Sequence, residues 1–232
     1  MDGRQEAWEK TVNHGPRFIS RKEPIMLRGI TWFHHSSLLI QKGGKAVYID
    51  PWELPDEAPK ADVVLITHEH FDHYSIGDIK KISGPKTQTI APNSMLGRVM
   101  QKVKYLKPGD KIAIDNFTIE AVAAYNEKQS FHPSSSQWLG YILEIDSMRY
   151  YHAGDTDFIP EMKGLKVDVA FLPVGGTYTM DAEVAVKAAE AIEARLVVPI
   201  HWGKVVGTEQ DAVLFCQKYK GKSEILKPGK SY

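Results

Sequence analysis

The sequence of 232 residues has one cysteine, no net charge and no long apolar run. Because Cys216 is alone, the chain can form neither an intramolecular disulfide nor a metal site built from several thiolates. Its 29 basic residues balance 29 acidic ones, so the overall charge does not attract nucleic acid or an anionic membrane. No stretch approaches the roughly 20 apolar residues of a membrane span, and residues 1–24 lack the apolar segment of a secretory signal. These absences predict a cytoplasmic protein with no membrane span.

The composition is that of a folded protein, with 43% hydrophobic and 25% charged residues. The length is sufficient for one domain with a well-buried core. No linker rich in proline, glycine or serine divides the chain. We therefore expect a polar arm or helix over residues 1–24 and a single domain over residues 25–232.

Short apolar runs rich in valine, isoleucine and tyrosine, interrupted by glycine, proline and aspartate, predict a strand-rich α/β (α+β) fold. The expected strands are 25–32, 37–41, 45–49, 62–67, 87–91, 111–114, 117–123, 138–145, 148–152, 167–172, 195–200 and 223–226. Apolar residues at helical spacing predict helices over 94–103, 182–194 and 208–219. Cys216 lies on the apolar side of the last helix, so it is expected to pack rather than react.

Three histidines fall within six residues, in the run from Thr67 to His73, Thr-His-Glu-His-Phe-Asp-His. The run follows a continuous apolar stretch, as expected where a strand buried on both faces ends. His68 and His70 point the same way if the backbone stays extended, and the loop then turns Asp72 and His73 back toward them. Imidazoles and a carboxylate without thiolates suit zinc or a similar metal in a hydrolytic centre.

Other predicted strands also end in a residue that can bind a metal. Asp50 ends the run 45–49, Asp155 follows the run 148–152 and His201 ends the run 195–200. Each residue alone would be weak evidence, because a single histidine after an apolar run is commonly just solvated. Since ligands of α/β sheets bind at the carboxyl ends of strands, the set together predicts one shared site.

At these positions the sequence resembles the metallo-β-lactamase superfamily. The run from Thr67 to His73 matches the superfamily signature, and Gly154-Asp155-Thr156 and Pro199-Ile200-His201 match its later ligand motifs in order. The resemblance extends from about residue 27 to the C-terminus. It is strongest to small single-domain metal-dependent hydrolases, which are similar to ascorbate-phosphate lactonase and to the phospholipase D that cleaves N-acyl phosphatidylethanolamine. It implies a four-layer αββα sandwich of two mixed sheets.

The resemblance also implies a ligand set. His68 and His70 would hold one metal, Asp155 would bridge, and a second metal would be held by Asp72, His73 and His201. The family's remaining histidine for the first metal corresponds either to Asn126 or, as we favour, to His132 in a longer loop. The implied cofactor is one or two Zn²⁺ ions, with Mn²⁺ or Fe²⁺ as alternatives.

The resemblance implies hydrolysis by a metal-bound hydroxide, because a metal lowers the pKa of its water from 15.7 to around 7. Asp72 or Asp155 would orient the water and accept its proton, with Asp72 as the expected catalytic residue, and His35 would be a substrate-binding or acid/base residue beside the metals. Asp50 is expected to support a ligand histidine. The predicted substrate is a small-molecule ester, lactone or phosphoester.

Three alternatives remain open at this point: a nuclease on the same fold, a diiron redox protein and a non-catalytic metal-binding scaffold. The neutral charge and the absence of a basic block disfavour nucleic acid as a partner. A diiron protein of this fold generally has a carboxylate at the position of His70, together with a flavin domain. The sequence leaves the oligomeric state open, a homo-oligomer included.

Overall fold

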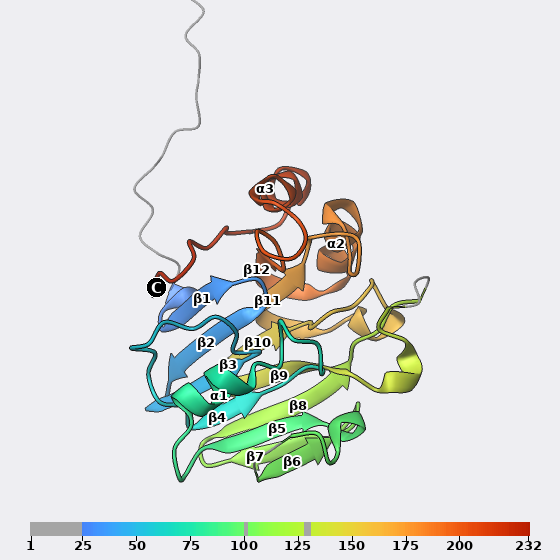
Figure 1. Ribbon diagram of the computed structural model, residues 1–232. Coiled ribbons are helices and arrows are strands. Elements are labelled where there is room, and N and C mark those ends of the chain that lie inside the picture. Colours follow the sequence, from blue (N-terminus) through green and yellow to red (C-terminus); the bar gives the residue numbers. More distant parts are fainter. Residues whose placement is uncertain (1–24, 100–101, 128–130) are drawn as a thin grey trace, which may run out of the picture.

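The computed structural model describes residues 25–99, 102–127 and 131–232. In this part of the chain, two six-stranded sheets pack face to face (Figure 1). The first sheet contains, in spatial order, β1 (Ile30–His34), β2 (Ser37–Lys42), β3 (Lys45–Ile49), β4 (Val63–Leu65), β5 (Gln88–Pro92) and β6 (Val103–Leu106). The second contains β12 (Glu193–Ile200), β11 (Lys166–Pro173), β10 (Met148–His152), β9 (Leu139–Ile145), β8 (Phe117–Ala123) and β7 (Lys111–Ile114).

Both sheets are mixed, and each comes from one continuous half of the chain. In the first, β1, β2 and β3 are antiparallel, and β3 to β6 run parallel to one another. In the second, β7 to β10 are antiparallel, and β10, β11 and β12 are parallel. The carboxyl ends of the parallel strands therefore provide one rim on each sheet, as expected for ligand binding in α/β folds.

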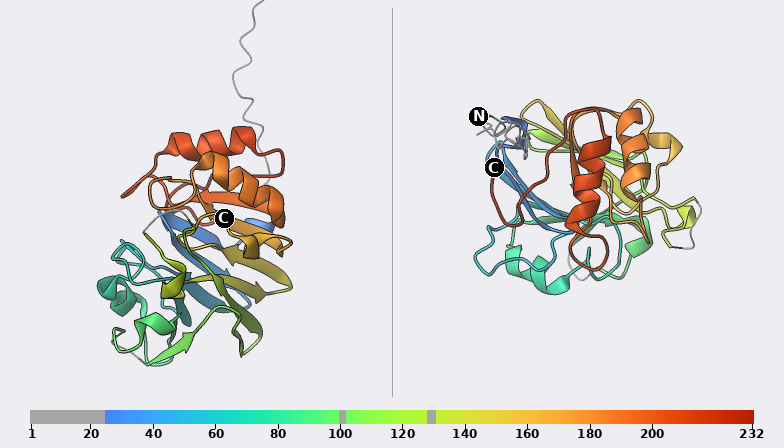
Figure 2. Two further views of the ribbon diagram at one scale, coloured as in Figure 1. Left: turned by 90° about the vertical axis from the view of Figure 1, so that its right-hand side faces the viewer. Right: turned by 90° about the horizontal axis from the view of Figure 1, so that it is seen from above.

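Helices cover the outer faces of the two sheets, which completes the predicted αββα arrangement (Figure 2). The helix α1 (Ile76–Ile82) packs against the first sheet, whereas α2 (Ala182–Ala191) and α3 (Glu209–Lys218) pack against the second. Short 3₁₀ helices span Ile25–Leu27, Asn93–Met95, Ser134–Ser136 and Pro160–Met162. None of the helices in the described residues is long and apolar enough to cross a membrane.

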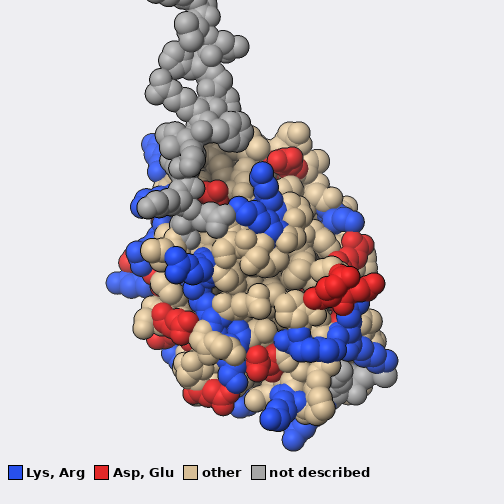
Figure 3. All heavy atoms as spheres, turned by 90° about the vertical axis from the view of Figure 1, so that its left-hand side faces the viewer, with Lys and Arg blue, Asp and Glu red and all other residues tan. Residues whose placement is uncertain are grey.

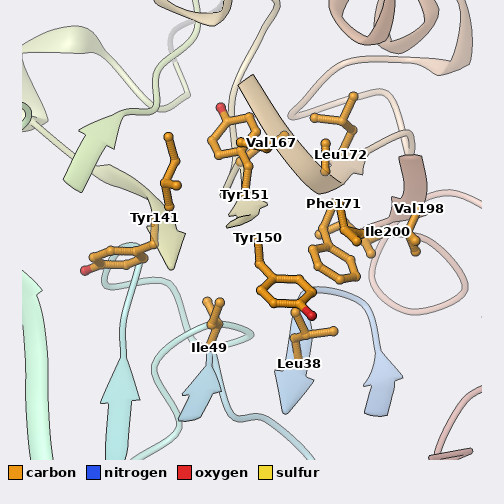
Figure 4. Packing of buried hydrophobic residues seen from close by; sticks show 14 of the residues in the cluster. Leu38, Ile49, Tyr141, Tyr150, Tyr151, Val167, Phe171, Leu172, Val198 and Ile200 are labelled. Atoms are coloured by element: carbon orange, nitrogen blue, oxygen red, sulfur yellow. The ribbon is translucent and has the colours of Figure 1, made fainter. Parts of the chain in front are cut away.

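The alternation along β3 shows how one strand serves two apolar layers. Val47 and Ile49 face the core between the sheets, while Ala46 and Tyr48 belong to the cluster beneath α1. This period of two is the geometry of a strand that is buried on both faces. From the second sheet, Tyr150 points toward Leu38 of the first (Figure 4).

Tyr141 fixes the second sheet to the strand that leads into the histidine motif. Its ring is fully buried, and its hydroxyl donates a hydrogen bond of 2.7 Å to the carbonyl of Ile66. Burial of this kind raises the pKa of the Tyr141 hydroxyl well above its ordinary value. The phenol therefore stays protonated and keeps donating across the two layers.

Three of the predicted elements are wrong in the described residues. The expected helix over 94–103 is instead a 3₁₀ turn at Asn93–Met95 followed by β6, which pairs with β5. Gly97 has a φ of +80°, which interrupts a right-handed helix, and Leu96 is exposed rather than buried. The expected strand over 223–226 is reduced to one bridge, between Val197 and Ser223.

The expected strand over 25–32 begins only at Ile30. The residues before it form a 3₁₀ turn, and Gly29 adopts a φ of +77°. A side chain at Gly29 would collide with the carbonyl of Gln41 on β2, so only glycine allows this approach. The predicted arm or helix over residues 1–24 lies outside the described residues.

A buried carboxylate at the start of α1 holds the loop that follows β3. Asp78 is 8% exposed and accepts hydrogen bonds from the backbone N–H groups of Glu53 and Leu54, at 2.8 and 3.1 Å. We expect Asp78→Ala to lower the free energy of unfolding by about 1–3 kcal/mol, because the buried N–H of Leu54 and the partly buried N–H of Glu53 both lose their acceptor. Urea unfolding of the two proteins measures the difference.

Asp56→Ala is the matched control, since Asp56 faces the same Lys81 as Asp78 does but is an exposed carboxylate. Exposed ion pairs contribute little, so this control is expected to change stability by less than about 0.5 kcal/mol. Equal losses for the two variants would contradict a specific role of Asp78 in holding the loop.

Candidate metal centre

The predicted site residues meet at one place, in loops at the rims of both sheets. The first sheet contributes His35 from the turn between β1 and β2, and the run His68–His73 from the loop after β4. The second contributes His132 from the loop between β8 and β9, together with Asp155 after β10 and His201 directly after β12. All of these ligand candidates are buried except His70, which is half-buried.

Three histidines form a first group whose ring nitrogens lie within 4.8 Å of one another: His68, His70 and His132. The Nε2 atom of His68 lies 3.0 Å from Nδ1 of His70, so both nitrogens face the same small space. The ring of His132 is 5.2 Å from that of His68 and 5.1 Å from that of His70. Three imidazoles that converge in this way are a common ligand set for zinc and for other first-row metals.

A second group contains a carboxylate and three histidines: His35, Asp72, His73 and His201. Asp72 Oδ2 lies 3.0 Å from Nε2 of His35 and 3.8 Å from Nε2 of His73. The rings of His35 and His201 are 3.8 Å apart. The structure thus brings His35 into direct contact with Asp72, the other predicted catalytic residue.

Asp155 lies between the two groups. Its Oδ2 atom is 3.3 Å from Nε2 of His132 and 3.1 Å from Nε2 of His201, and its Oδ1 atom is 3.3 Å from Nε2 of His73. Nε2 of His68 is 3.9 Å from the same Oδ2 atom. One carboxylate therefore faces two histidines of each group.

Several buried polar atoms at the centre make no hydrogen bond within the described residues. They include Nε2 of His73, Nε2 of His132 and Oδ1 of Asp155, which point toward one another. Buried polar atoms are nearly always paired, so such a convergent group requires an explanation. Neutral nitrogens and a carboxylate oxygen around one space fit a divalent cation, and the residues present therefore suit the metal that the sequence predicts.

The pKa values of the buried histidines differ sharply. Burial lowers the pKa of His35 to about 4 and that of His68 well below its ordinary value, so both rings are neutral and can donate a lone pair. Burial would also lower the pKa of His73, but the carboxylates of Asp155 and Asp50 outweigh it and raise it well above the ordinary value. A bound cation would replace that proton as the positive charge beside Asp155.

Asp50 supports the histidine motif from the end of β3, as the sequence predicts. Its carboxylate is fully buried, lies 2.7 Å from Nδ1 of His73, and accepts hydrogen bonds from the backbone and the hydroxyl of Thr67 at 2.8 and 2.7 Å. The proton on Nδ1 of His73 is thereby held toward Asp50, which leaves Nε2 facing the centre. Thr67 was not singled out by sequence reasoning, although it opens the motif.

Asn126 and His132 were the two sequence candidates for the same position, and they lie in contact. Nδ1 of His132 is 3.1 Å from the carbonyl of Tyr178, and the Asn126 amide donates to that carbonyl at 2.8 Å. Nε2 of His132 instead faces Asp155. The geometry therefore favours His132 as the ligand and Asn126 as its support. Sequence reasoning missed the Tyr178 carbonyl, because a backbone acceptor has no sequence signal.

Backbone strain is concentrated around the centre. Four non-glycine residues there have a left-handed φ, between 47° and 60°: His35, Asp50, His132 and His201. This conformation costs a non-glycine residue about 1–3 kcal/mol and persists where the surroundings enforce it. The fold thus holds these four residues in strained backbone conformations, as is common at functional sites.

The comparisons with known proteins agree with this geometry. Residues 29–201 match the family model described as a beta-lactamase superfamily domain. A UPF0173 protein of Pyrococcus abyssi is 35% identical over 189 residues, which cover 77% of this chain and 85% of the relative. A UPF0173 metal-dependent hydrolase of Methanosphaerula palustris is 33% identical, with 80% of this chain and 88% of the relative covered.

A solved structure from Parabacteroides distasonis superposes with a TM-score of 0.76 at 36% sequence identity, and the match covers 84% of this chain and 91% of that one. The family model spans well over half of the chain and includes every residue of the two ligand groups. The chain therefore belongs to the metallo-β-lactamase superfamily.

Proposed function

We propose that this protein is a metal-dependent hydrolase that cleaves an ester, lactone or phosphoester of a small molecule. The observation that carries the proposal is Asp155, which faces histidines of two neighbouring ligand groups, so that the centre can hold two metals close together. The name of the Methanosphaerula palustris relative, a metal-dependent hydrolase, supports the same activity. In this proposal, Asp155 would be a ligand shared by both metals.

The proposed ligands follow the two groups. His68, His70 and His132 would hold one metal, and Asp72, His73 and His201 would hold the other. Zn²⁺ suits these nitrogen-rich sets best, and Mn²⁺ or Fe²⁺ would fit the same ligands. When bound, such a metal would supply water of lowered pKa, about 7, and a positive charge that polarises the scissile carbonyl or phosphoryl group.

The residues of the chain itself supply orientation and proton transfer. Asp72 is 6% exposed, and the hydrogen bond from His35 helps to hold the pKa of its carboxyl below the ordinary value, against the opposing effect of burial. Asp72 is therefore an ionised acceptor for a proton of the attacking water. The neutral ring of His35 fixes the orientation of Asp72 through the contact of 3.0 Å.

The charge distribution supports a small-molecule substrate rather than a nucleic acid. The formal net charge is zero, and acidic and basic side chains are interspersed on the face drawn in Figure 3. Nucleic-acid binding depends on basic side chains that neutralise a run of phosphates. A small-molecule substrate does not need such a basic surface, so the mixed charge of this protein agrees with a small-molecule substrate.

The test of the proposal is His68→Ala. Since this change removes a buried ligand of the first group, we expect the purified variant to hold less metal than the wild type and to lose hydrolysis of model esters and phosphoesters by at least about 10²-fold. Elemental analysis and steady-state kinetics measure the two effects. Unchanged metal content together with unchanged hydrolysis would contradict the proposal.

His34→Ala is the matched control, because His34 precedes His35 in the sequence but belongs to neither ligand group. It is expected to retain the metal content of the wild type. A wild-type protein that binds metal but cleaves neither esters nor phosphoesters would instead favour the alternative of a non-catalytic metal-binding scaffold.

A further inference from the structure

Among the proposed ligands, all within the described residues, His70 is the one that is not buried; His68, His73 and His201 are each at most 1% exposed. We therefore expect a substrate to approach the centre beside His70. The residues that surround His70 at the surface decide which chemical groups can lie against the reacting bond.

Two pairs of aromatic side chains contain an exposed phenylalanine. Phe71, 68% exposed, lies between His70 and Asp72 in the sequence, and its ring meets that of Trp52 edge-on, with 5.9 Å between the ring centroids. In the second pair, Phe131 is 49% exposed, and its ring centroid lies 4.8 Å from that of Tyr178.

Both aromatic pairs are tied to the centre. Trp52 lies 5.6 Å from the ring of His35. Phe131 immediately precedes His132, whose ring is 5.1 Å from that of His70. The aromatic side chains therefore border the metal ligands themselves rather than a remote surface.

A third apolar side chain completes this border. Val205 is 53% exposed and follows His201 by four residues, and the ion pair between Lys204 and Glu53, of 2.9 Å, places its loop beside Trp52. Its φ is +58°, a conformation that a β-branched residue adopts only with strain. We call Trp52, Phe71, Phe131, Tyr178 and Val205 the apolar rim.

Two pairs of charged side chains lie next to the rim in the described residues. Glu69 pairs with Arg98, and Glu53 pairs with Lys204. A strongly charged ligand would have to compete with these pairs, whereas an apolar group would gain from covering the exposed rings. The charge pattern and the exposed apolar area therefore favour the same kind of occupant.

We propose that the apolar rim binds an aliphatic acyl chain of the substrate, so that the natural substrate is an ester or lactone with a hydrocarbon arm several carbons long. This inference rests on the proposed function, since it places that arm beside the scissile bond. Phe71 and Phe131 are then specificity-determining residues. Their contribution lies in binding the chain rather than in the chemical step.

The first experiment compares hydrolysis of p-nitrophenyl acetate, butyrate and octanoate by the metal-loaded protein. Each buried methylene contributes roughly a fourfold gain in binding, so kcat/KM is expected to rise at least about tenfold from acetate to octanoate. Phe71→Ser is expected to reduce that rise at least about fivefold, mainly through KM. Val213→Ser, at an exposed valine of α3 outside the rim, is the matched control and should leave the rise unchanged.

A second measurement separates this inference from the proposed function. Calorimetric titration of the metal-loaded protein with octanoate and with acetate needs no catalysis, and octanoate is expected to bind at least about tenfold more tightly, with the difference reduced in Phe71→Ser. If neither esters nor phosphoesters are cleaved but octanoate retains this advantage, the rim still binds an aliphatic chain, whereas the proposed function falls. Equal binding of the two acids would overturn the rim proposal, as would a dimer in sedimentation velocity that Phe71→Ser dissociates.

Discussion

Asp155→Asn is expected to remove most of the bound metal and to reduce hydrolysis below detection. Asp155 is 4% exposed, and His73, His132 and His201 hold its oxygens within 3.3 Å. The neighbouring histidines, His201 and His73 foremost, hold the pKa of its carboxyl well below the ordinary value even though burial opposes this. It is therefore a carboxylate at every pH at which the protein would work.

Asparagine at position 155 keeps the shape of the aspartate side chain but removes its negative charge. Two divalent cations brought close together need a shared anion, so the variant is expected to lose metal affinity by more than the roughly 10–100-fold that follows loss of a supporting contact. Elemental analysis after dialysis and kinetics at saturating metal measure the two losses.

Asp157→Asn is the matched control for Asp155→Asn. Asp157 is two residues away and accepts a hydrogen bond from the backbone of Glu127, outside both ligand groups. The Asp157→Asn protein is expected to bind as much metal as the wild type. Full metal loading of Asp155→Asn at wild-type affinity would show that the carboxylate does not bridge.

Asp50→Ala is expected to give the largest loss of stability among the variants considered. Asp50 is fully buried, and His73 and both polar groups of Thr67 depend on it. Removal of one partner of a buried charged pair typically costs about 3–5 kcal/mol, because the other partner is left uncompensated. Urea unfolding of the metal-free protein is the measurement, so that loss of metal does not contribute.

Asp62→Ala provides the comparison for Asp50→Ala. Asp62 also accepts a backbone hydrogen bond, from Ala46 at 2.9 Å, but its side chain is 43% exposed. Water can replace that contact, so the expected loss is about 1 kcal/mol or less. Losses of equal size for the two variants would mean that the burial and the charge of Asp50 do not account for its contribution to stability.

The local pattern of apolar and polar residues was sufficient to predict most of the strands and the convergence of the candidate ligands at one centre. Three apolar runs, 45–49, 148–152 and 195–200, form β3, β10 and β12 at nearly those bounds. Since strand direction fixes which end of a run carries the polar residue, Asp155 and His201 could be expected near the histidine motif before any distance was known.

The remaining features of the fold and of the site depend on contacts that the sequence pattern does not reveal. The helix α1 was not predicted, because it is short and contains Gly77, although Ser75 and Asp78 form a capping signal at its start. The contact of His35 with Asp72 joins residues 37 positions apart, and only the packing of the sheet determines it. The contacts of Asn126 and His132 with the carbonyl of Tyr178, which leave Nε2 of His132 toward Asp155, likewise depend on a loop far along the chain.

The division of the two sheets between the two halves of the chain has a consequence during protein synthesis. The first half carries the motif His68–His73, but the proposed centre also needs His132, Asp155 and, last to leave the ribosome, His201. A nascent chain that lacks the second half has only part of either ligand set, and incomplete sets hold metal weakly. In the proposed centre, capture of the metal would therefore join the two halves of the chain, and a tightly bound ion would mark molecules synthesised at least through His201.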